Sequence, residues 1–523
     1  MWETKVKNPI LRGFNPDPNI LKVGDMYYIA VSSFEWLPGV RVYNSKDLVN
    51  WQYLTDILTH EVNLKGNPEG CSIWAPQLSY ADGLFYCIYT DVKSTQRPFK
   101  DSHNYLITSS SITGPWSEPI YMNSSGFDPS LFHDKDGRKW FLNEIWDYRM
   151  TTGNKSAGIV MQEYDAQKES LVGQVYKIFD GTSLAKTEAP HIYRHGEYYY
   201  LITAEGGTGH DHSVTICRSK TITGPYDLDP NYPMLTASDQ PQSPLQCSGH
   251  ASLVQGPTGD WYIAYLCTRP LLGKAAILGR ETAIQEVVWT EDGWLRLANG
   301  TTAPEKETIV KTLEPDQQKI NTGFLDDFNE SLLPEWNALR IMPDSSWCDL
   351  ASRPGYLRLI SGESPQSTFE HHLLAIRQKD FHFIVTTKMT FNPQTYNQMA
   401  GVLLFLNSRN YLYMYVTHDE ELGKVLRISK SAGGIFTLSD VIVPIANEEL
   451  CLKVEVDGAV AKFYYRRSDI ENWKQLGEIQ DVLFLAGGFT GNFVGLACHD
   501  MDRKAGCFAE FSYFEYQGLD QTL

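Results

Sequence analysis

A four-residue phrase that recurs five times in the first half of the chain constrains the fold more than any other feature. Each copy begins with a small, acidic or histidine residue, usually followed by proline, then any residue and an aliphatic one, as in Asp17-Pro18-Asn19-Ile20. The copies begin at Asp17, Ala75, Asp128, Ala189 and His250. They lie roughly 50 to 60 residues apart, which is typical of a repeated supersecondary unit.

The same local pattern follows every copy. A turn rich in glycine and aspartate leads into an aromatic run, as in Gly24-Asp25-Met26-Tyr27-Tyr28. A turn of this kind between β-rich runs is typical of a β-hairpin. Five sheet units of this length predict a five-bladed β-propeller. The less favoured alternative is a series of unrelated hairpins in a sandwich, which would need no repeated phrase.

The second half of the chain lacks the repeat and has a different sequence pattern. The repeats end near Leu297, and a polar segment follows at 301–318. Beyond it, strand-like runs such as Tyr356-Leu357-Arg358-Leu359-Ile360 alternate with turns rich in glycine, asparagine and aspartate. This alternation predicts a β-sandwich. The sequence therefore predicts an all-β chain with a propeller domain at 1–305, a linker at 306–322 and a sandwich domain at 323–523.

Composition excludes several classes of partner. The formal charge of −18 on 523 residues disfavours nucleic acid and anionic membrane surfaces, so a neutral ligand is expected. No apolar run reaches the length of a membrane span, and no apolar leader follows Met1. The nine cysteines form no Cys-x-x-Cys pair, which favours reduced thiols in a cytoplasmic protein unless a leader has been removed.

The copies differ at the positions that would face the propeller axis. The first position of the phrase holds two carboxylates and a histidine, and the residue before it holds a third carboxylate and two aromatic rings. These residues are Asp17, Asp128 and His250 at the first position, and Trp74, Phe127 and Glu188 before it. If the five copies are structurally alike, all six side chains converge on one small pocket.

Such convergence has a chemical consequence. Carboxylates crowded in a partly dry cleft cannot all ionise at their usual pKa. One can stay protonated as an acid while another is ionised as a base, which glycoside hydrolysis requires. An Asp-Pro pair by itself often serves only to form a turn, but glutamate is not a favoured turn residue. The joint pattern therefore favours a functional role for Asp17, Asp128 and Glu188.

The sequence resembles that of glycoside hydrolase family 43. The resemblance rests on the order and spacing of short blocks that cover nearly the whole chain. They are Phe14-Asn15-Pro16-Asp17-Pro18, Ser33-Phe34-Glu35-Trp36-Leu37-Pro38-Gly39, Ile73-Trp74-Ala75-Pro76, Phe127-Asp128-Pro129-Ser130, Thr187-Glu188-Ala189-Pro190-His191, Ser248-Gly249-His250-Ala251-Ser252 and Leu278-Gly279-Arg280-Glu281-Thr282-Ala283. Arg353-Pro354-Gly355-Tyr356-Leu357 and Gly488-Phe489-Thr490-Gly491 resemble the concanavalin-like jelly roll that follows the propeller in the family's β-xylosidases.

The resemblance implies an inverting mechanism. Asp17 would be the general base that activates water, and Glu188 the general acid that protonates the leaving oxygen. Asp128 would orient Glu188 and raise its pKa by like charge. Inversion needs room for a water molecule, so the acid and base carboxyls are expected roughly 6.5–9.5 Å apart.

The resemblance also implies a set of substrate-binding residues. Phe34, Trp74, Phe127 and Trp146 would wall the sugar subsites, and Arg280 would donate hydrogen bonds to sugar hydroxyls. His250 would sit under the site near Asp128, or be an ordinary core histidine. Thr208 would line the pocket or be a plain loop residue. Phe489 would reach the mouth of the pocket from the sandwich, whereas Phe493 is expected in the sandwich core.

No cofactor is expected to be required. A divalent ion such as calcium near His250, on the propeller axis, is the less favoured alternative, because the sequence adds no second ligand. The resemblance to the family suggests a homodimer or homotetramer, but the residues of this sequence indicate no interface.

The expected activity is exo-acting release of xylose from the non-reducing end of short β-1,4-xylo-oligosaccharides. The near alternative is an α-L-arabinofuranosidase, or both activities together, because the two sugars place similar hydroxyls in a shared pocket. Relatives that act on xylo-oligosaccharides often carry an arginine before Leu64-Lys65-Gly66, and residues 59–63 contain none. That departure leaves the sugar preference open. A non-catalytic carbohydrate-binding protein is the remote alternative, since such a protein would not need all three carboxylates.

Overall fold

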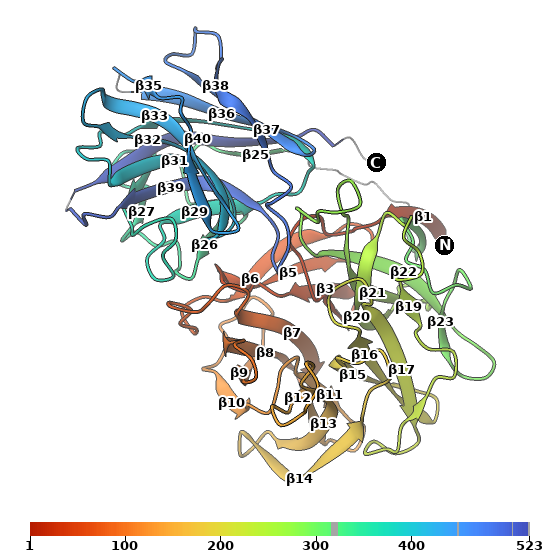
Figure 1. Ribbon diagram of the computed structural model, residues 1–523. Helices are drawn as coiled ribbons and strands as arrows, with labels where there is room; N and C mark the ends of the chain where they lie inside the picture. Colours follow the sequence, from red (N-terminus) through yellow and green to blue (C-terminus); the bar gives the residue numbers. More distant parts are fainter. Residues whose placement is uncertain (315–322, 447–448, 505, 521–523) are drawn as a thin grey trace.

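Five antiparallel sheets, one from each copy of the phrase, surround a central axis in the computed structural model, which describes residues 1–314, 323–446, 449–504 and 506–520 (Figure 1). The first blade contains β2 (Asn19–Val23), β3 (Met26–Val31), β5 (Gly39–Ser45) and β6 (Gln52–Leu58). The second contains β7 (Ser72–Ala81), β8 (Leu84–Ser94), β9 (Asp101–Ser109) and β10 (Ile120–Asn123). The third contains β11 (Ser130–His133), β12 (Lys139–Trp146), β13 (Ser156–Asp165) and β14 (Ser170–Phe179).

The last two blades complete the ring. The fourth contains β15 (Glu188–His195), β16 (Tyr198–Glu205), β17 (Ser213–Ser219), β18 (Asp227–Leu228) and β19 (Leu235–Thr236). The fifth contains β20 (Gln246–Gln255), β21 (Trp261–Thr268), β22 (Glu281–Trp289) and β23 (Leu295–Leu297). The described residues contain no helix, and the predicted five-bladed propeller is confirmed.

The third residue of the phrase joins neighbouring blades. Asn19 Oδ1 accepts a hydrogen bond from Leu78 N at 2.8 Å. Gln77 Oε1 accepts one from Leu131 N at 3.0 Å. Ser252 Oγ, in the last blade, accepts from Ile20 N in the first at 2.9 Å. These bonds satisfy buried backbone groups across the blade junctions and thereby close the ring.

The first residue of the phrase has a left-handed backbone in every blade. The φ angles are 54° at Asp17, 39° at Ala75, 53° at Asp128, 51° at Ala189 and 50° at His250. This conformation costs a non-glycine residue roughly 1–2 kcal/mol. Its recurrence shows that the five copies are structurally equivalent. In β7, β15 and β20 the pairing register also shifts at the phrase, and such bulges redirect side chains.

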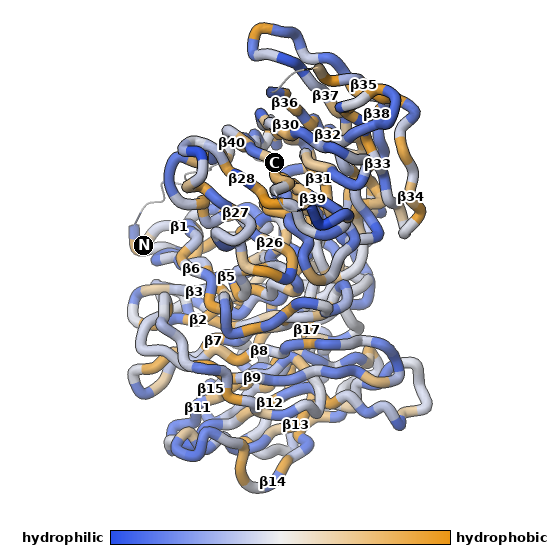
Figure 2. The backbone as a smooth tube through the Cα atoms, turned by 90° about the vertical axis from the view of Figure 1, so that its left-hand side faces the viewer, coloured by the Kyte–Doolittle hydropathy of each residue, from blue (hydrophilic) through white to orange (hydrophobic). Residues whose placement is uncertain are grey.

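The sandwich consists of two packed sheets. One contains β25 (Gly323–Asp326), β27 (Cys348–Asp349), β28 (Leu357–Ile360), β30 (His382–Thr390), β36 (Glu449–Asp457), β37 (Val460–Arg466), β38 (Lys474–Asp481) and β40 (Phe508–Gly518). The other contains β26 (Asn337–Leu339), β29 (Leu373–Arg377), β31 (Gln398–Asn407), β32 (Asn410–Asp419), β33 (Gly423–Ala432), β34 (Ile435–Leu438), β35 (Val443–Pro444) and β39 (Phe493–Asp500). Hydrophobic and hydrophilic residues mix along the strands (Figure 2), and buried residues alternate with more exposed ones along β30, which is the pattern of a sheet with one buried face.

One short strand of the propeller belongs to the sandwich. β4 (Trp36–Leu37), which lies between β3 and β5 in the sequence, pairs with β26 at the edge of the second sandwich sheet. Trp36 also stacks on Phe493 with ring centroids 3.6 Å apart. The sequence pattern gave no sign of this shared sheet, because β4 is only two residues long.

The segment between the domains is partly described. β24 (Glu307–Thr312) lies inside the predicted linker and pairs with β1 (Trp2–Lys7). Residues 315–322, the rest of that linker, lie outside the described residues. The predicted domain boundaries stay a prediction.

Replacing Trp36 by alanine should loosen the contact between the domains. The ring is 1% exposed, and removing a buried tryptophan costs about 3–5 kcal/mol. We expect a lower urea midpoint for the first unfolding transition, followed by tryptophan fluorescence. Trp2→Ala is the matched control, because Trp2 is 54% exposed. Equal midpoints for the two variants would contradict the prediction.

Candidate active site

All eleven predicted site residues line one cavity of about 330 Å³ near the propeller axis, between the propeller and the sandwich. Ten come from the propeller, and one, Phe489, comes from the loop before β39. The predicted residues are Asp17, Phe34, Trp74, Phe127, Asp128, Trp146, Glu188, Thr208, His250, Arg280 and Phe489. For Asp17, Trp74, Phe127, Asp128, Glu188 and His250, convergence follows from the equivalence of the five copies of the phrase.

Asp17 is the most completely bonded carboxylate in this cavity. Arg280 Nη1 donates to Oδ1 at 2.5 Å, and Ser32 Oγ donates to Oδ2 at 2.6 Å. His250 Nδ1 lies 3.7 Å from Oδ1, and His250 lines the same cavity as Asp128. Burial raises the pKa of Asp17, but the charges of Arg280 and His250 and the bond from Ser32 outweigh it and lower the pKa below its usual value. Asp17 is therefore ionised at neutral pH.

Glu188 and Asp128 behave in the opposite way. Burial, opposed by the charge of Lys100, raises the pKa of Glu188 to about 7. Burial and the charge of Glu188 raise the pKa of Asp128 well above its usual range. Asp128 is 7% exposed. One cavity thus holds an ionised carboxylate, Asp17, and two carboxyls with raised pKa values, of which Asp128 keeps its proton at neutral pH and Glu188 loses it as the pH rises through about 7.

Aromatic rings form the walls. The ring centroids of Phe34 and Trp74 lie 5.8 Å apart, and the two ring planes are tilted by 40°. Trp74 meets Phe127 edge to face at 5.5 Å, and Phe127 lies 6.2 Å from Trp146. Apolar ring faces beside polar groups suit the alternating C–H and O–H surface of a sugar.

The sandwich closes one side of the cavity. Phe489 stacks on Phe34 with centroids 5.8 Å apart and planes 18° from parallel. The Phe489 carbonyl also accepts a hydrogen bond from Arg280 Nε at 3.1 Å. Phe493 is fully buried, but it packs against Phe14 and Trp36 of the propeller and so lies in the hydrophobic cluster between the two domains, whereas the sequence led us to expect it in the sandwich core.

One terminal nitrogen of the Arg280 guanidinium is available to a ligand. Its Nη2 is buried and has no hydrogen-bond partner in the part of the chain that the structure describes. A buried guanidinium nitrogen is costly to leave unpaired. Because Arg280 lines the cavity, a ligand hydroxyl is a suitable acceptor.

Sequence reasoning missed the polar lining residues Thr95, Arg97, Lys100, Asn154, Ser156 and Lys186. It also missed Glu144, which does not line the cavity but interacts electrostatically with Asp128 and Glu188. Lys100 lies over the rings of Phe127 and Trp146, 3.7 and 4.0 Å from their centroids. Glu144 is fully buried, and burial raises its pKa to about 8. Lys100 lies in a loop outside the repeated phrase, and Glu144 lies on the second strand of its blade, so comparing the copies of the phrase could not find them.

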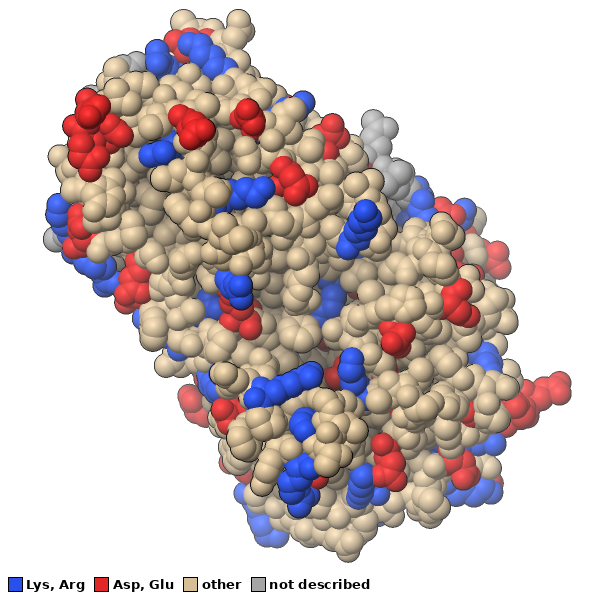
Figure 3. Space-filling view, viewed as in Figure 1, with Lys and Arg blue, Asp and Glu red and all other residues tan. Residues whose placement is uncertain are grey.

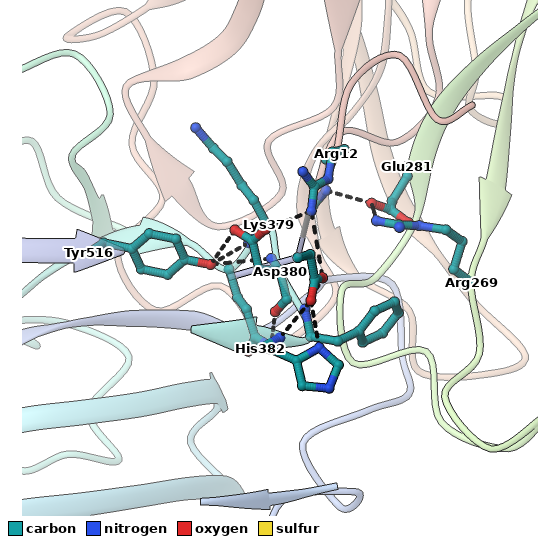
Figure 4. A network of polar contacts seen from close by, with 11 residues as sticks. Arg12, Arg269, Glu281, Lys379, Asp380, His382 and Tyr516 are labelled. Atoms are coloured by element: carbon teal, nitrogen blue, oxygen red, sulfur yellow. Dashed lines mark hydrogen bonds and ion pairs between the residues drawn. The ribbon is translucent and has the colours of Figure 1, made fainter. Parts of the chain in front are cut away.

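The loop that leads to Asp17, between β1 and β2, is held by the last blade and by the sandwich (Figure 4). Glu281, next to Arg280, accepts a hydrogen bond from Gly13 N at 2.7 Å and pairs with Arg269 at 2.6 Å. On the sandwich side, Arg12 Nη2 pairs with Asp380 Oδ1 at 2.6 Å.

Gly13 shows how closely the sandwich approaches this segment. Its φ is +76°, and a Cβ atom there would lie 2.5 Å from the carbonyl oxygen of Gln378. Beside it, Arg377 Nε donates to the carbonyl of Phe14 at 2.8 Å. The backbone four residues before Asp17 is therefore fixed by contacts from the second domain.

Comparisons with known proteins agree with this site. The family model of the glycosyl hydrolases family 43 matches residues 6–295, and that of the β-xylosidase C-terminal concanavalin A-like domain matches residues 325–517. The chain belongs to glycosyl hydrolase family 43 and is a glycoside hydrolase.

Three relatives illustrate the similarity. The chain is 41% identical to the β-xylosidase of Bacillus subtilis (strain 168), over 98% of this chain and 99% of the relative. It is 40% identical to the xylosidase/arabinosidase 43B of Humicola insolens, over 98% of each chain. A crystal structure of xylan β-1,4-xylosidase from Bacillus halodurans C-125 superposes with a TM-score of 0.95 at 46% identity, over 98% of this chain and 100% of that chain.

Replacing Arg12 by glutamine should impair catalysis although Arg12 does not line the cavity. We expect kcat/KM for a glycoside to fall roughly tenfold, because removing Arg12 from this partly buried ion pair leaves the buried Asp380 without its cation and frees the segment before Asp17. If Asp17 then shifts relative to Arg280, its pKa rises, and the acidic limb of the pH–rate profile moves to higher pH.

The control for this variant is Arg138→Gln. Arg138 is exposed and pairs with Asp136 within its own hairpin. A folded Arg12→Gln protein with the wild-type kcat/KM and pH profile would show that the sandwich contact does not position Asp17.

Proposed function

We propose that this chain is an inverting, exo-acting β-xylosidase that releases xylose from the non-reducing end of short β-1,4-xylo-oligosaccharides. The observation that carries the proposal is the charge division in one cavity. Asp17 has a lowered pKa and Glu188 a pKa of about 7. Inverting glycosidases need such a pair, a base for water and an acid for the leaving oxygen.

The proposed mechanism uses each group once. The terminal xylose lies against Phe34 and Trp74 with a hydroxyl on the free nitrogen of Arg280. Asp17 takes a proton from a water molecule, whose oxygen attacks the anomeric carbon from the face opposite the leaving group. The glycosidic bond breaks, and the leaving oxygen takes the proton of Glu188. Burial and the charge of Asp17 keep that proton on Glu188 until it is needed. Asp128, which lines the same cavity, would orient Glu188.

Two features support xylose release from chain ends. The cavity of about 330 Å³ is walled by Trp74 and by Phe489, so it suits a terminal sugar better than the middle of a long chain. The relatives from B. subtilis and B. halodurans are named as β-xylosidases. The H. insolens relative is named as acting on both sugars, which supports arabinofuranosidase activity as the second candidate.

Side-by-side kinetics test the proposal. We expect kcat/KM to be much larger on a chromogenic β-D-xylopyranoside than on an α-L-arabinofuranoside, with xylose released from xylobiose. Proton NMR of the first product should show α-xylose, the inverted anomer. A large excess on the arabinofuranoside would select the second candidate, and β-xylose as the first product would overturn inversion.

The Glu188→Gln variant tests whether Glu188 is the general acid. On xylobiose, kcat should fall by roughly 10²–10⁴, the usual value of acid catalysis, whereas an aryl xyloside with a good leaving group should lose much less. Asp17→Asn is the matched control and should impair both substrates, because attack by water is needed for each. Equal losses of Glu188→Gln on both substrates would contradict its role.

The pH profile follows from the two pKa shifts. Asp17 must be ionised, and its lowered pKa places the acidic limb of kcat/KM below the usual pKa range of an aspartate. Glu188 must be protonated, so activity falls as pH rises through about 7. We expect a bell-shaped profile from initial rates on xylobiose. Activity that still increases above pH 8 would exclude Glu188 as the acid.

A further inference from the structure

Three cationic side chains border the active-site cavity near Glu188. Arg97 and Lys100 belong to the loop between β8 and β9, and Lys186 lies just before β15; all three line the cavity. In Figure 3, lysine and arginine side chains gather around the hollow below the sandwich. A neutral sugar gives no reason for this charge, and the chain as a whole carries −18.

None of these cations forms an ion pair with a carboxylate in the part of the chain that the structure describes. Arg97 Nη1 donates to the carbonyl of Gly153 at 3.1 Å, and Lys186 Nζ reaches the carbonyl of Gly206 at 3.5 Å. Lys100 lies over aromatic rings. Three like charges that share a rim repel one another unless an anion lies between them.

The floor of the cavity does little to balance this charge. Asp17 is already paired with Arg280. Burial raises the pKa values of Asp128 and Glu144, so these two carboxyls mostly keep their protons at neutral pH. Glu188, with a pKa of about 7, is about half ionised there and offsets only part of the charge of the three cations. The mouth of the cavity is therefore positive.

The position of the cations relates them to the leaving group. Glu188, as the proposed acid, must face the leaving oxygen, and Lys186 lies two residues before it. Arg97 and Lys186 are exposed, so their side chains can reach a sugar that projects from the mouth. They lie where the sugars after the cleaved bond would emerge.

We propose that the mouth of this cavity binds a carboxylate on the leaving-group side of the substrate, and that the preferred substrates are xylo-oligosaccharides bearing a uronic acid. A guanidinium can hold a carboxylate with two hydrogen bonds, and a lysine adds a mobile point charge. The inference rests on the proposed function, because it assumes that Glu188 faces the leaving group.

The test compares kcat/KM on xylotriose with that on xylotriose bearing one glucuronic acid, on either its middle or its reducing-end xylose. At low salt, we expect one acidic isomer to exceed xylotriose by about fivefold, the scale of two partly exposed ion pairs. This ratio should approach one in 0.5 M NaCl, because salt screens exposed charges.

Arg97→Gln and Lys186→Gln should each lower the acidic-to-neutral ratio by about two- to threefold. The control is Lys46→Gln, which removes one exposed positive charge on the β5–β6 turn, away from the cavity lining, and should leave the ratio unchanged. If the cations only tune Glu188, the variants will shift the pH profile equally for both substrates and keep the ratio, which would overturn the proposal.

A wild-type ratio at or below one for both acidic isomers would also overturn it. Failure of the proposed function would look different, because xylotriose itself would not be hydrolysed.

Discussion

The ion pair between Asp17 and Arg280 joins the first blade of the propeller to the last. It lowers the pKa of the carboxylate that is to act as base, and it lies where the ring closes, since Asn15 N donates to the Arg280 carbonyl and Leu11 pairs with Thr282. Catalytic charge and ring closure therefore depend on the same few residues. A propeller that failed to close would lose its base together with its shape.

The same cavity holds one carboxyl whose pKa is lowered and two whose pKa values are raised. What separates them is the set of neighbours. Asp17 has an arginine and a serine hydroxyl within 2.6 Å, whereas the charge of Lys100 only partly offsets the burial of Asp128 and Glu188. Burial acts on all three in the same direction, so the specific partners decide which carboxyl is the base and which is the acid.

The sandwich is part of the active site. It contributes Phe489 to the wall, a carbonyl to Arg280 and the contacts on Arg12 and Gly13 that fix the approach to Asp17. A continuous set of aromatic contacts runs from Trp36 through Phe493 and Phe14 to Phe34 at the cavity. Changes in the domain contact can therefore reach the substrate site through packed rings.

The repeated phrase and its variation were enough to predict the propeller, the three carboxylates and the rings of Trp74 and Phe127, because equivalent positions in equivalent blades must face the same axis. Phe34, Trp146, Arg280 and Phe489 were expected only from the family resemblance. The shared strand β4, the buried Glu144 and the cations Arg97, Lys100 and Lys186 could not be predicted in this way. They depend on where loops and the second domain come to lie, and no periodicity governs that. The sequence by itself determined which chemical groups converge. Only the tertiary structure decided their partners, and so which of them is charged, because pKa depends on distances and burial that the order of residues does not contain.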